Sequence, residues 1–314
     1  WVASQENPQY QMSIRDIGAR QIDLVDAGDV PEFVLESDMP TPPNADGSSE
    51  KTDSLNTIAS LQYRNAIRDA HPGAIYYHQG SKYEVSKLDL DNDRAYLEKT
   101  DDEHYTQPLF DKEVQINEIE KSEPVTQGSE IVVGFADVTV TERLLGYRVS
   151  YPDGGERQEY QLKLPPSKVG TKAVFLTIRD QSLTQPVEQI GERRNVDSPL
   201  RSALHAIEHA MIGLLPLELL IDRNDVGGLS TAGHAQTGLP TIFIYDAHKG
   251  GVGIAASAFN RIETILENAK DRINSCECDA GCPKCIIDSN CGNANDYLNK
   301  DLAIQLLDTI TAMR

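Results

Sequence analysis

Cysteine is absent from the first 275 residues of this 314-residue chain, and all five cysteines lie between Cys276 and Cys291. An odd number of thiols, in a chain with no visible export signal, disfavours a disulfide framework. No apolar run approaches eighteen residues, which excludes a membrane-spanning helix. No basic segment precedes an apolar run, which argues against a signal peptide. We therefore expect a cytoplasmic protein with no membrane partner, and the start at Trp1 suggests a piece of a longer protein.

Basic residues are scarce, because 29 Lys and Arg face 49 Asp and Glu, giving a net charge of -20. A generic nucleic-acid-binding protein is expected to be basic, since its affinity comes largely from cations at phosphates. Aspartate outnumbers glutamate, and lysine is rarer than arginine. Because molar salt shortens the Debye length to about 3 Å and so screens such self-repulsion, we expect a halophilic host.

The first half of the chain has mainly the patterns of β-structure. Residues 36–54 are rich in Pro, Asp, Ser and Gly, which predicts a long exposed loop. A short helix is predicted at 57–70. Strand-like runs then flank the turns at 79–81, 91–93 and 152–155, and continue to residue 164. Pro and Gly at 165–170 suggest a boundary, so we predict a β-rich accessory or linker domain at 1–165.

The second half changes to a helical period. Ser198 and Pro199 favour a helix start, and Leu200, Leu204 and Ile207 begin an apolar stripe. The apolar run at 240–246 predicts a buried strand, followed by a helix at 254–273 and a last helix at 301–313. We therefore predict an α+β fold, with a mixed α/β domain at 166–314 that carries a four-cysteine zinc knot.

The cysteines have the spacing of a metal site, C-x-C-x3-C-x2-C-x5-C. Four thiolates around a tetrahedral zinc ion make a closed site that stabilises structure without chemistry, although an iron–sulfur cluster also uses four thiolates. The predicted ligands are Cys278, Cys282, Cys285 and Cys291, with Cys276 as an alternative to Cys278.

His205, Glu208 and His209 match the H-x-x-E-H spacing of inverted zinc peptidases. The two histidines are one helical turn apart and could face one ion, with Glu208 as a general base. The alternative is a set of polar contacts at the edge of the apolar stripe, and no third ligand stands at a convincing spacing.

Three further segments are candidates for DNA contact. His248 and Lys249 lie in a glycine-rich turn between a strand and a helix, where a helix N-terminus favours anions. A structural turn that needs glycine for close packing explains the same residues. Tyr77 and Lys82 lie in an aromatic and basic stretch suited to stacking on bases, and Arg193 and Arg194 form a small basic patch.

Several motifs in one order resemble the C-terminal region of YprA/MrfA-type DEAD/DEAH-box DNA helicases. They include "LHAIEHAMIGLLP", "DRNDVGGLS", "PTIFIYDAHKGGVGIA" and "CECDAGCPKC", and the earlier segment "HPGAIYYHQGSKYEVSKLDL" is similar to the β segment that follows the motor. The resemblance implies an ATP-dependent superfamily 2 helicase that moves 3′ to 5′ and acts in DNA repair. It also implies a zinc-binding domain with four cysteines, and a related region occurs in phage-defence proteins.

The chain departs from this family in lacking a motor. It has no G-x-x-x-x-G-K-[ST] loop and no D-E-x-H or D-E-x-D box, since "DDEHY" at 101–105 has the wrong spacing. We therefore expect an accessory region that engages single-stranded or forked DNA, with ATP bound only by motor domains supplied in cis or in trans. The alternatives are a zinc metallohydrolase using His205, Glu208 and His209, and a non-catalytic scaffold subunit of a phage-defence complex.

Overall fold

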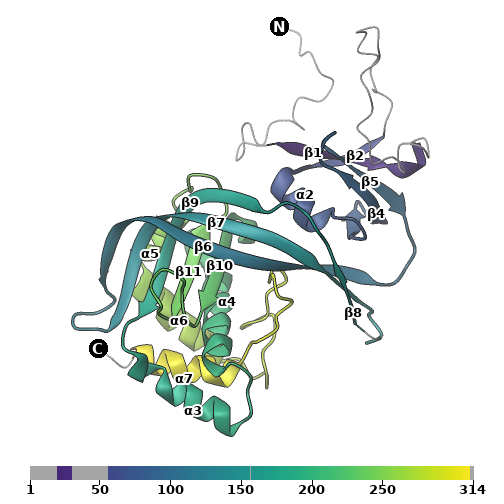
Figure 1. The fold of residues 1–314 in the computed structure, drawn as a ribbon. Coiled ribbons are helices and arrows are strands. Elements are labelled where there is room, and N and C mark those ends of the chain that lie inside the picture. Colours follow the sequence, from purple (N-terminus) through teal and green to yellow (C-terminus); the bar gives the residue numbers. More distant parts are fainter. Residues whose placement is uncertain (1–19, 30–55, 156, 312–314) are drawn as a thin grey trace. The chain divides into compact units, whose positions relative to one another are not determined.

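The computed structural model describes residues 20–29, 56–155 and 157–311 (Figure 1). The loop predicted at 36–54 lies outside the described residues. The chain divides into two compact units, of which the first comprises residues 1–110 and 143–165 and the second 111–142 and 166–314. This division differs from the predicted domains in placing 111–142 with the second unit, and independent domains at 1–165 and 166–314 stay a prediction.

Unit 1 contains a five-stranded sheet in the order β2-β1-β5-β4-β3. The strands are β1 (Gln21–Asp26), β2 (Thr57–Gln62), β3 (Ile75–His78), β4 (Ser81–Asp89) and β5 (Arg94–Lys99), with η2 (Ala27–Asp29) after β1 and α2 (Tyr63–Asp69) after β2. The helix predicted at 57–70 therefore begins only at Tyr63, because the preceding six residues pair antiparallel with β1. Ala66 on α2 is fully buried and packs on Leu24, Val85 and Leu97 of the sheet.

His71 is a buried histidine of unit 1 that follows α2. Its Nδ1 lies 3.0 Å from the carbonyl oxygen of Pro72, and its ring centroid is 4.8 Å from that of Tyr147. Gly73 makes this packing possible, since a Cβ there would lie 2.2 Å from the Tyr147 hydroxyl and the residue has φ +77°. Burial lowers the pKa of His71 below its ordinary value of 6.5.

We expect His71 to make unit 1 less stable in acid. The folded state keeps the imidazole neutral while the unfolded state protonates it, so stability is lost as pH falls below about 6.5 and down to the depressed folded pKa. One such group gives a slope of at most about 1.4 kcal/mol per pH unit. Urea unfolding between pH 5 and 7.5 should show a weaker pH dependence for His71→Gln than for the parent and for His78→Gln on β3. Equal slopes in all three proteins would contradict the assignment.

Unit 2 is built on a sheet in the order β10-β11-β9-β7-β6. Its strands are β6 (Tyr105–Pro124), β7 (Ile131–Ser150), β9 (Ser167–Ile178), β10 (Val226–Thr231) and β11 (Thr241–Asp246), and β8 (Gln158–Gln161) pairs with the end of β7 that belongs to unit 1. The strands β6 and β7 are twenty residues each and continue through the unit boundaries. All twelve residues of β9 are paired with β7.

Both faces of the central strands are apolar. Successive side chains of a strand point to opposite sides of the sheet, so a continuous apolar run covers both sides. On β11, Ile242 and Ile244 join the main core beneath the helices, whereas Phe243 and Tyr245 pack on the other face with Phe175 and Val114. The continuous apolar run predicted as a buried strand is therefore central, and every residue of β11 is buried.

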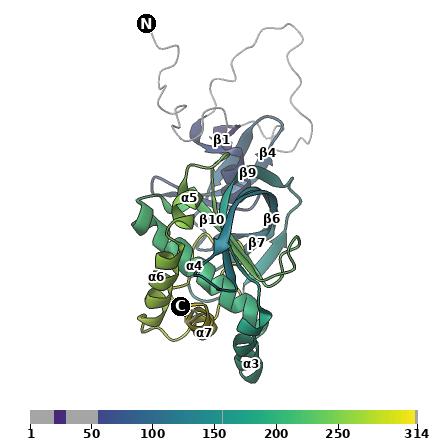
Figure 2. The same ribbon diagram turned by 90° about the vertical axis from the view of Figure 1, so that its left-hand side faces the viewer.

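The helices of unit 2 are α3 (Gln185–Arg193), α4 (Pro199–Leu219), α5 (Ile254–Phe259), α6 (Ile262–Asn274) and α7 (Lys300–Thr311), with short η3 (Gln181–Leu183) and η4 (Arg223–Asp225). The helix α4 is the most buried, and it contacts β10, α3, α6 and α7 (Figures 1 and 2). The single helix predicted at 254–273 is divided at Asn260 and Arg261. Ser198 precedes α4 with φ 50° and makes no side-chain cap, although Pro199 occupies the first turn as predicted.

The architecture confirms the predicted α+β class, with a β-rich first half followed by helices and a cluster of four cysteines. Within the described residues, no helix combines the length and the apolar character needed to cross a membrane.

Candidate metal centre

Four cysteines place their sulfur atoms around one point in the loop after α6. Cys276, Cys278, Cys282 and Cys285 have ligand atoms within 4.8 Å of one another. The Sγ atoms are 3.5 Å apart for 276–278, 276–282 and 278–285, and 3.8 Å apart for 282–285. A tetrahedral zinc ion with Zn–S bonds of about 2.3 Å implies S···S edges of about 3.8 Å, whereas a disulfide has about 2.05 Å. The cluster therefore fits a four-thiolate zinc ion, and its cysteines are free thiols.

The turn from Gly281 to Cys285 aims two of these sulfurs. The carbonyl of Cys282 accepts the N–H groups of Cys285 and Ile286 at 3.0 and 3.1 Å, and the Cys282 N–H lies 3.2 Å from the Cys285 sulfur. Gly281 has φ +125°, and a Cβ at this position would lie 2.7 Å from the Ile286 side chain. Glycine is thus required both for the backbone conformation and for the close approach.

Lys300 carries a buried positive charge beside the cluster. Its side chain is 8% exposed, and Nζ donates to the carbonyls of Cys276 and Cys278, the latter at 2.7 Å, while lying 3.8 Å from the Cys278 sulfur. A zinc ion with four thiolates has a net charge of -2, which this ammonium partly offsets. Because Lys300 is also the first residue of α7, the metal loop and the last helix are joined directly.

The thiols differ in acidity in the absence of an ion. Hydrogen bonds from the Cys278 backbone and thiol, followed by that of Cys282, lower the pKa of Cys276 to about 7. Burial raises the pKa of Cys285 to about 12. Cys276 therefore ionises more readily than Cys285, and a bound divalent cation would favour the thiolate form of all four ligands.

The predicted ligand set differs from the observed cluster by one cysteine, because the structure groups Cys276, and not Cys291, with Cys278, Cys282 and Cys285. The Cys291 sulfur lies instead 3.5 Å from Nε2 of His205 on α4. The thiol also donates to Asn293 Oδ1 at 2.8 Å, and the N–H of Asn295 lies 3.3 Å from the sulfur. The C-x5-C spacing between Cys285 and Cys291 gives no sign that Cys291 lies beside His205, which is 86 residues away in the sequence.

The histidine pair of the predicted hydrolase lies in the core, away from solvent. His205, Glu208 and His209 are all less than a tenth exposed on α4, and burial lowers the pKa of His205. The Glu208 side chain points at β10, where a Cβ at Gly228 would lie 2.6 Å from Oε1. Such burial leaves no room for a peptide substrate, so the geometry does not favour hydrolysis.

The helix terminus considered for phosphate is filled by an acidic side chain. The Asp246 carboxylate, which is fully buried, accepts the N–H groups of Gly253, Ile254 and Ala255 at 2.8, 3.3 and 2.7 Å, and also that of Val252. His248 Nε2 lies 3.0 Å from Asp225 Oδ1. These contacts favour a structural turn over a phosphate site. The N-terminus of α5 is already occupied by the Asp246 carboxylate, and Lys249 is exposed beside it.

Tyr77 and Lys82 lie on the β3–β4 hairpin of unit 1, where they are register partners. The Tyr77 side chain is 63% exposed, and Lys82 Nζ lies 5.7 Å from the centre of its ring. The same ammonium donates to the carbonyl of His104 at 2.6 Å and to that of Asp102. The hairpin therefore presents the exposed ring of Tyr77 beside the Lys82 ammonium, which backbone carbonyls fix in position.

Arg193 and Arg194 lie at the C-terminal end of α3. Arg194 Nη1 forms an ion pair with Asp301 Oδ2 at 2.6 Å, so part of the predicted basic patch is neutralised by α7. Arg193 is the basic residue in the last turn of α3 and is exposed to solvent.

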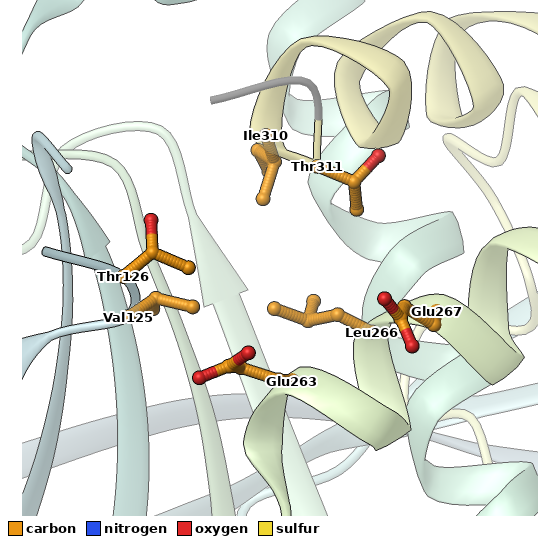
Figure 3. A pocket seen from close by; sticks show the side chains of 7 residues that line it. All are labelled: Val125, Thr126, Glu263, Leu266, Glu267, Ile310 and Thr311. Atoms are coloured by element: carbon orange, nitrogen blue, oxygen red, sulfur yellow. The ribbon is translucent and has the colours of Figure 1, made fainter. Parts of the chain in front are cut away.

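A hollow lies between the β6–β7 turn and the helices α6 and α7 (Figure 3). It is lined by Val125, Thr126, Glu263, Leu266, Glu267, Ile310 and Thr311. Two carboxylates among apolar and hydroxyl side chains would repel a phosphate, so this hollow does not suit nucleic acid.

Known proteins resemble this chain, some along nearly its whole length and one along about a third of it. It is 29% identical over 311 residues to the uncharacterized ATP-dependent helicase YprA of Bacillus subtilis, covering 98% of this chain and 36% of that protein. It is 34% identical over 110 residues to an uncharacterized protein of Methanocaldococcus jannaschii, covering 34% of this chain and 98% of that protein. A crystal structure of the DUF1998 helicase MrfA bound to DNA matches with a TM-score of 0.57 and 30% identity, over 98% of this chain and 36% of that one.

The chain spans about a third of the length of the helicases that it matches. The sequence family described as the MrfA Zn-binding domain matches residues 207–286, which contain most of α4 and the four clustered cysteines. The donor set and the family together point to zinc at this cluster. The resemblance inferred from the sequence motifs is thereby confirmed: the chain belongs to the family of the MrfA zinc-binding domain and corresponds to the C-terminal region of YprA/MrfA-type helicases.

Proposed function

We propose that this chain is the DNA-engaging accessory region of an ATP-dependent 3′–5′ superfamily 2 helicase that acts in DNA repair. The observation that carries the proposal is the match over 98% of the chain to a helicase whose solved structure holds DNA. The direction of movement and the repair role are part of the proposal, and the family resemblance supports them. Motor domains, in cis or in trans, would bind ATP and supply the force, since the phosphate-loop motif is absent from this sequence.

The zinc knot would act in this proposal as a structural clamp. Cys276, Cys278, Cys282 and Cys285 would hold the ion, and Lys300 would tie the loop to α7 through two carbonyls. The four thiolates fill a tetrahedral shell, so the ion offers no open position for water or substrate. The clamp would thus fix a surface for DNA and take no part in chemistry.

The hairpin carrying Tyr77 is the surface best suited to single-stranded DNA. An exposed aromatic ring offers every base a stacking partner, and a neighbouring lysine can reach a phosphate. Arg193 and Lys249 are exposed cations on the other unit that could contact phosphates. In a chain of net charge -20, such local cations decide where an anionic strand can lie.

We expect the purified chain to bind single-stranded or forked oligonucleotides with salt-dependent affinity and without hydrolysing ATP. Each phosphate contact to a single strand contributes about -0.7 to the slope of log affinity against log salt. Because base stacking on an aromatic ring is worth about 1–3 kcal/mol, Tyr77→Ala should weaken binding about tenfold. Fluorescence anisotropy over a range of KCl concentrations measures both effects.

The matched control is Tyr105→Ala on β6, which removes another exposed tyrosine of unit 1 and should leave affinity unchanged. Equal losses for both variants would remove Tyr77 from the DNA surface. No binding at any salt, together with capture of a partner ATPase, would contradict the proposal and favour the scaffold alternative.

A further inference from the structure

A second group of metal-ligand side chains lies in the core of unit 2, apart from the four clustered thiols. His205 and His209 on α4 and Cys291 in the loop before α7 have ligand atoms within 4.8 Å of one another. Their exposed fractions are 8%, 6% and 8%. Three side chains of the two types that most often bind zinc, histidine and cysteine, thus converge from segments more than eighty residues apart, in a place that water reaches poorly.

Both histidines present an unprotonated nitrogen to the centre of this group. Nδ1 of His209 lies 2.7 Å from the carbonyl oxygen of Ile286, and Nδ1 of His205 lies 3.1 and 3.2 Å from those of Asp296 and Tyr297. A carbonyl only accepts, so Nδ1 carries the hydrogen in each ring and the lone pair of the neutral imidazole is on Nε2. Histidines that bind metals are typically fixed in this way through the other ring nitrogen.

Glu208 adds a buried carboxylate beside the group. It is 6% exposed, and within the part of the chain that the structure describes it forms no hydrogen bond or ion pair. Its negative charge acts on both His205 and Cys291. A carboxylate at this position would attract a divalent cation to the group.

The distance between Cys291 and His205 agrees with coordination of one ion. Zn–S of about 2.3 Å and Zn–N of about 2.05 Å at a tetrahedral angle give an S···N distance of about 3.5 Å. The Cys291 Sγ and His205 Nε2 atoms are 3.5 Å apart.

We propose that His205, His209 and Cys291 form a second, buried zinc site that links α4 to the loop before α7. The two imidazoles bind through Nε2, and the Cys291 thiol loses its proton to solvent as the thiolate binds. The thiolate would offset part of the charge of the divalent ion. The site is distinct from the four-thiolate knot, and the matched family region, 207–286, contains neither His205 nor Cys291.

Metal content of the purified chain, after saturation with Zn²⁺ and removal of excess, tests the proposal. The parent should hold two zinc ions per chain, and Cys291→Ser and His205→Ala should each hold one. Ser289→Ala, an exposed neighbour in the same loop, should keep two. A hydrogen-bonded cluster without metal would leave one ion per chain in the parent and in the Cys291→Ser variant, and that result would overturn the proposal.

X-ray absorption at the zinc edge of the parent protein gives an answer that does not depend on a variant folding. Two sites should give a mixed shell of nitrogen and sulfur neighbours, whereas the knot alone gives sulfur only. A sulfur-only shell at one ion per chain would refute the second site. Neither measurement involves DNA. A failure of the chain to bind DNA would therefore leave the second zinc site unaffected, and absence of the second site would leave the proposed DNA binding unaffected.

Discussion

Loss of the ion from the four-thiolate knot is expected to unfold the loop at 275–299 and to release α7 from the core of unit 2. Structural zinc contributes about 10–16 kcal/mol of apparent binding free energy, which matches or exceeds the whole stability of a typical domain. Without the ion, Lys300 would remain buried beside thiols that no longer carry the charge of four metal-bound thiolates. Leu302, Leu306 and Leu307, which are fully buried on α7, would then lose their anchor at the start of the helix.

Cys285→Ser and treatment with a strong chelator should therefore give the same result, a loss of hydrogen-exchange protection in α7 and a fall of more than about 10 °C in the melting temperature. Glu277→Gln is the matched control, because Glu277 is exposed between two ligands and should change neither. Cys276→Ser should behave like Cys285→Ser. Protection of α7 that survives both chelation and Cys285→Ser would show that the knot does not hold the helix.

Asp246→Ala is expected to destabilise unit 2 by about 3–5 kcal/mol. The carboxylate accepts four backbone N–H groups at the start of α5, and it is completely buried at the end of β11. A buried donor left without a partner costs about 1–3 kcal/mol, and solvent entering the gap would satisfy some of the four. Asp246→Asn should fall between the parent and the alanine variant, because one of its two acceptors becomes a donor.

Urea unfolding measures the effect of Asp246→Ala, with Asp222→Ala as the control. Asp222 also caps a helix, η4, through its carboxylate, but it is exposed and water can replace it. We expect a clearly smaller loss there. Equal losses for the two variants would mean that burial of the Asp246 cap adds nothing.

The elements that were predicted well from the sequence are those whose apolar pattern is compatible with only one type of secondary structure. The apolar run at 240–246 can be buried on both faces only as a central strand, and it forms β11. The stripe from Leu200 forms α4, and the last helix starts within a residue of its predicted position. Residues 57–62 were predicted wrongly, because their helical pattern is weaker than the hydrogen bonds that β1 offers them.

The candidate metal centre was predicted in part for a similar reason. The C-x2-C turn brings Cys282 and Cys285 together through local geometry, so spacing was sufficient there. Choosing between Cys276 and Cys291 needs the tertiary position of His205 and His209, which spacing does not contain. The role of Asp246 as a buried helix cap was also missed. An aspartate at the end of a strand, followed by glycines, is equally compatible with an anion-binding turn.

The path of β7 has a consequence for how this region can be divided. Asp111–Glu142 supplies two strands of unit 2, yet the same strands continue into unit 1. A protein cut to begin at residue 166 would keep the zinc knot and α4. It would lose β7, which pairs with all twelve residues of β9. Its bare strand edge would invite self-association. Gene fusion or domain exchange at that point would therefore transfer an incomplete module.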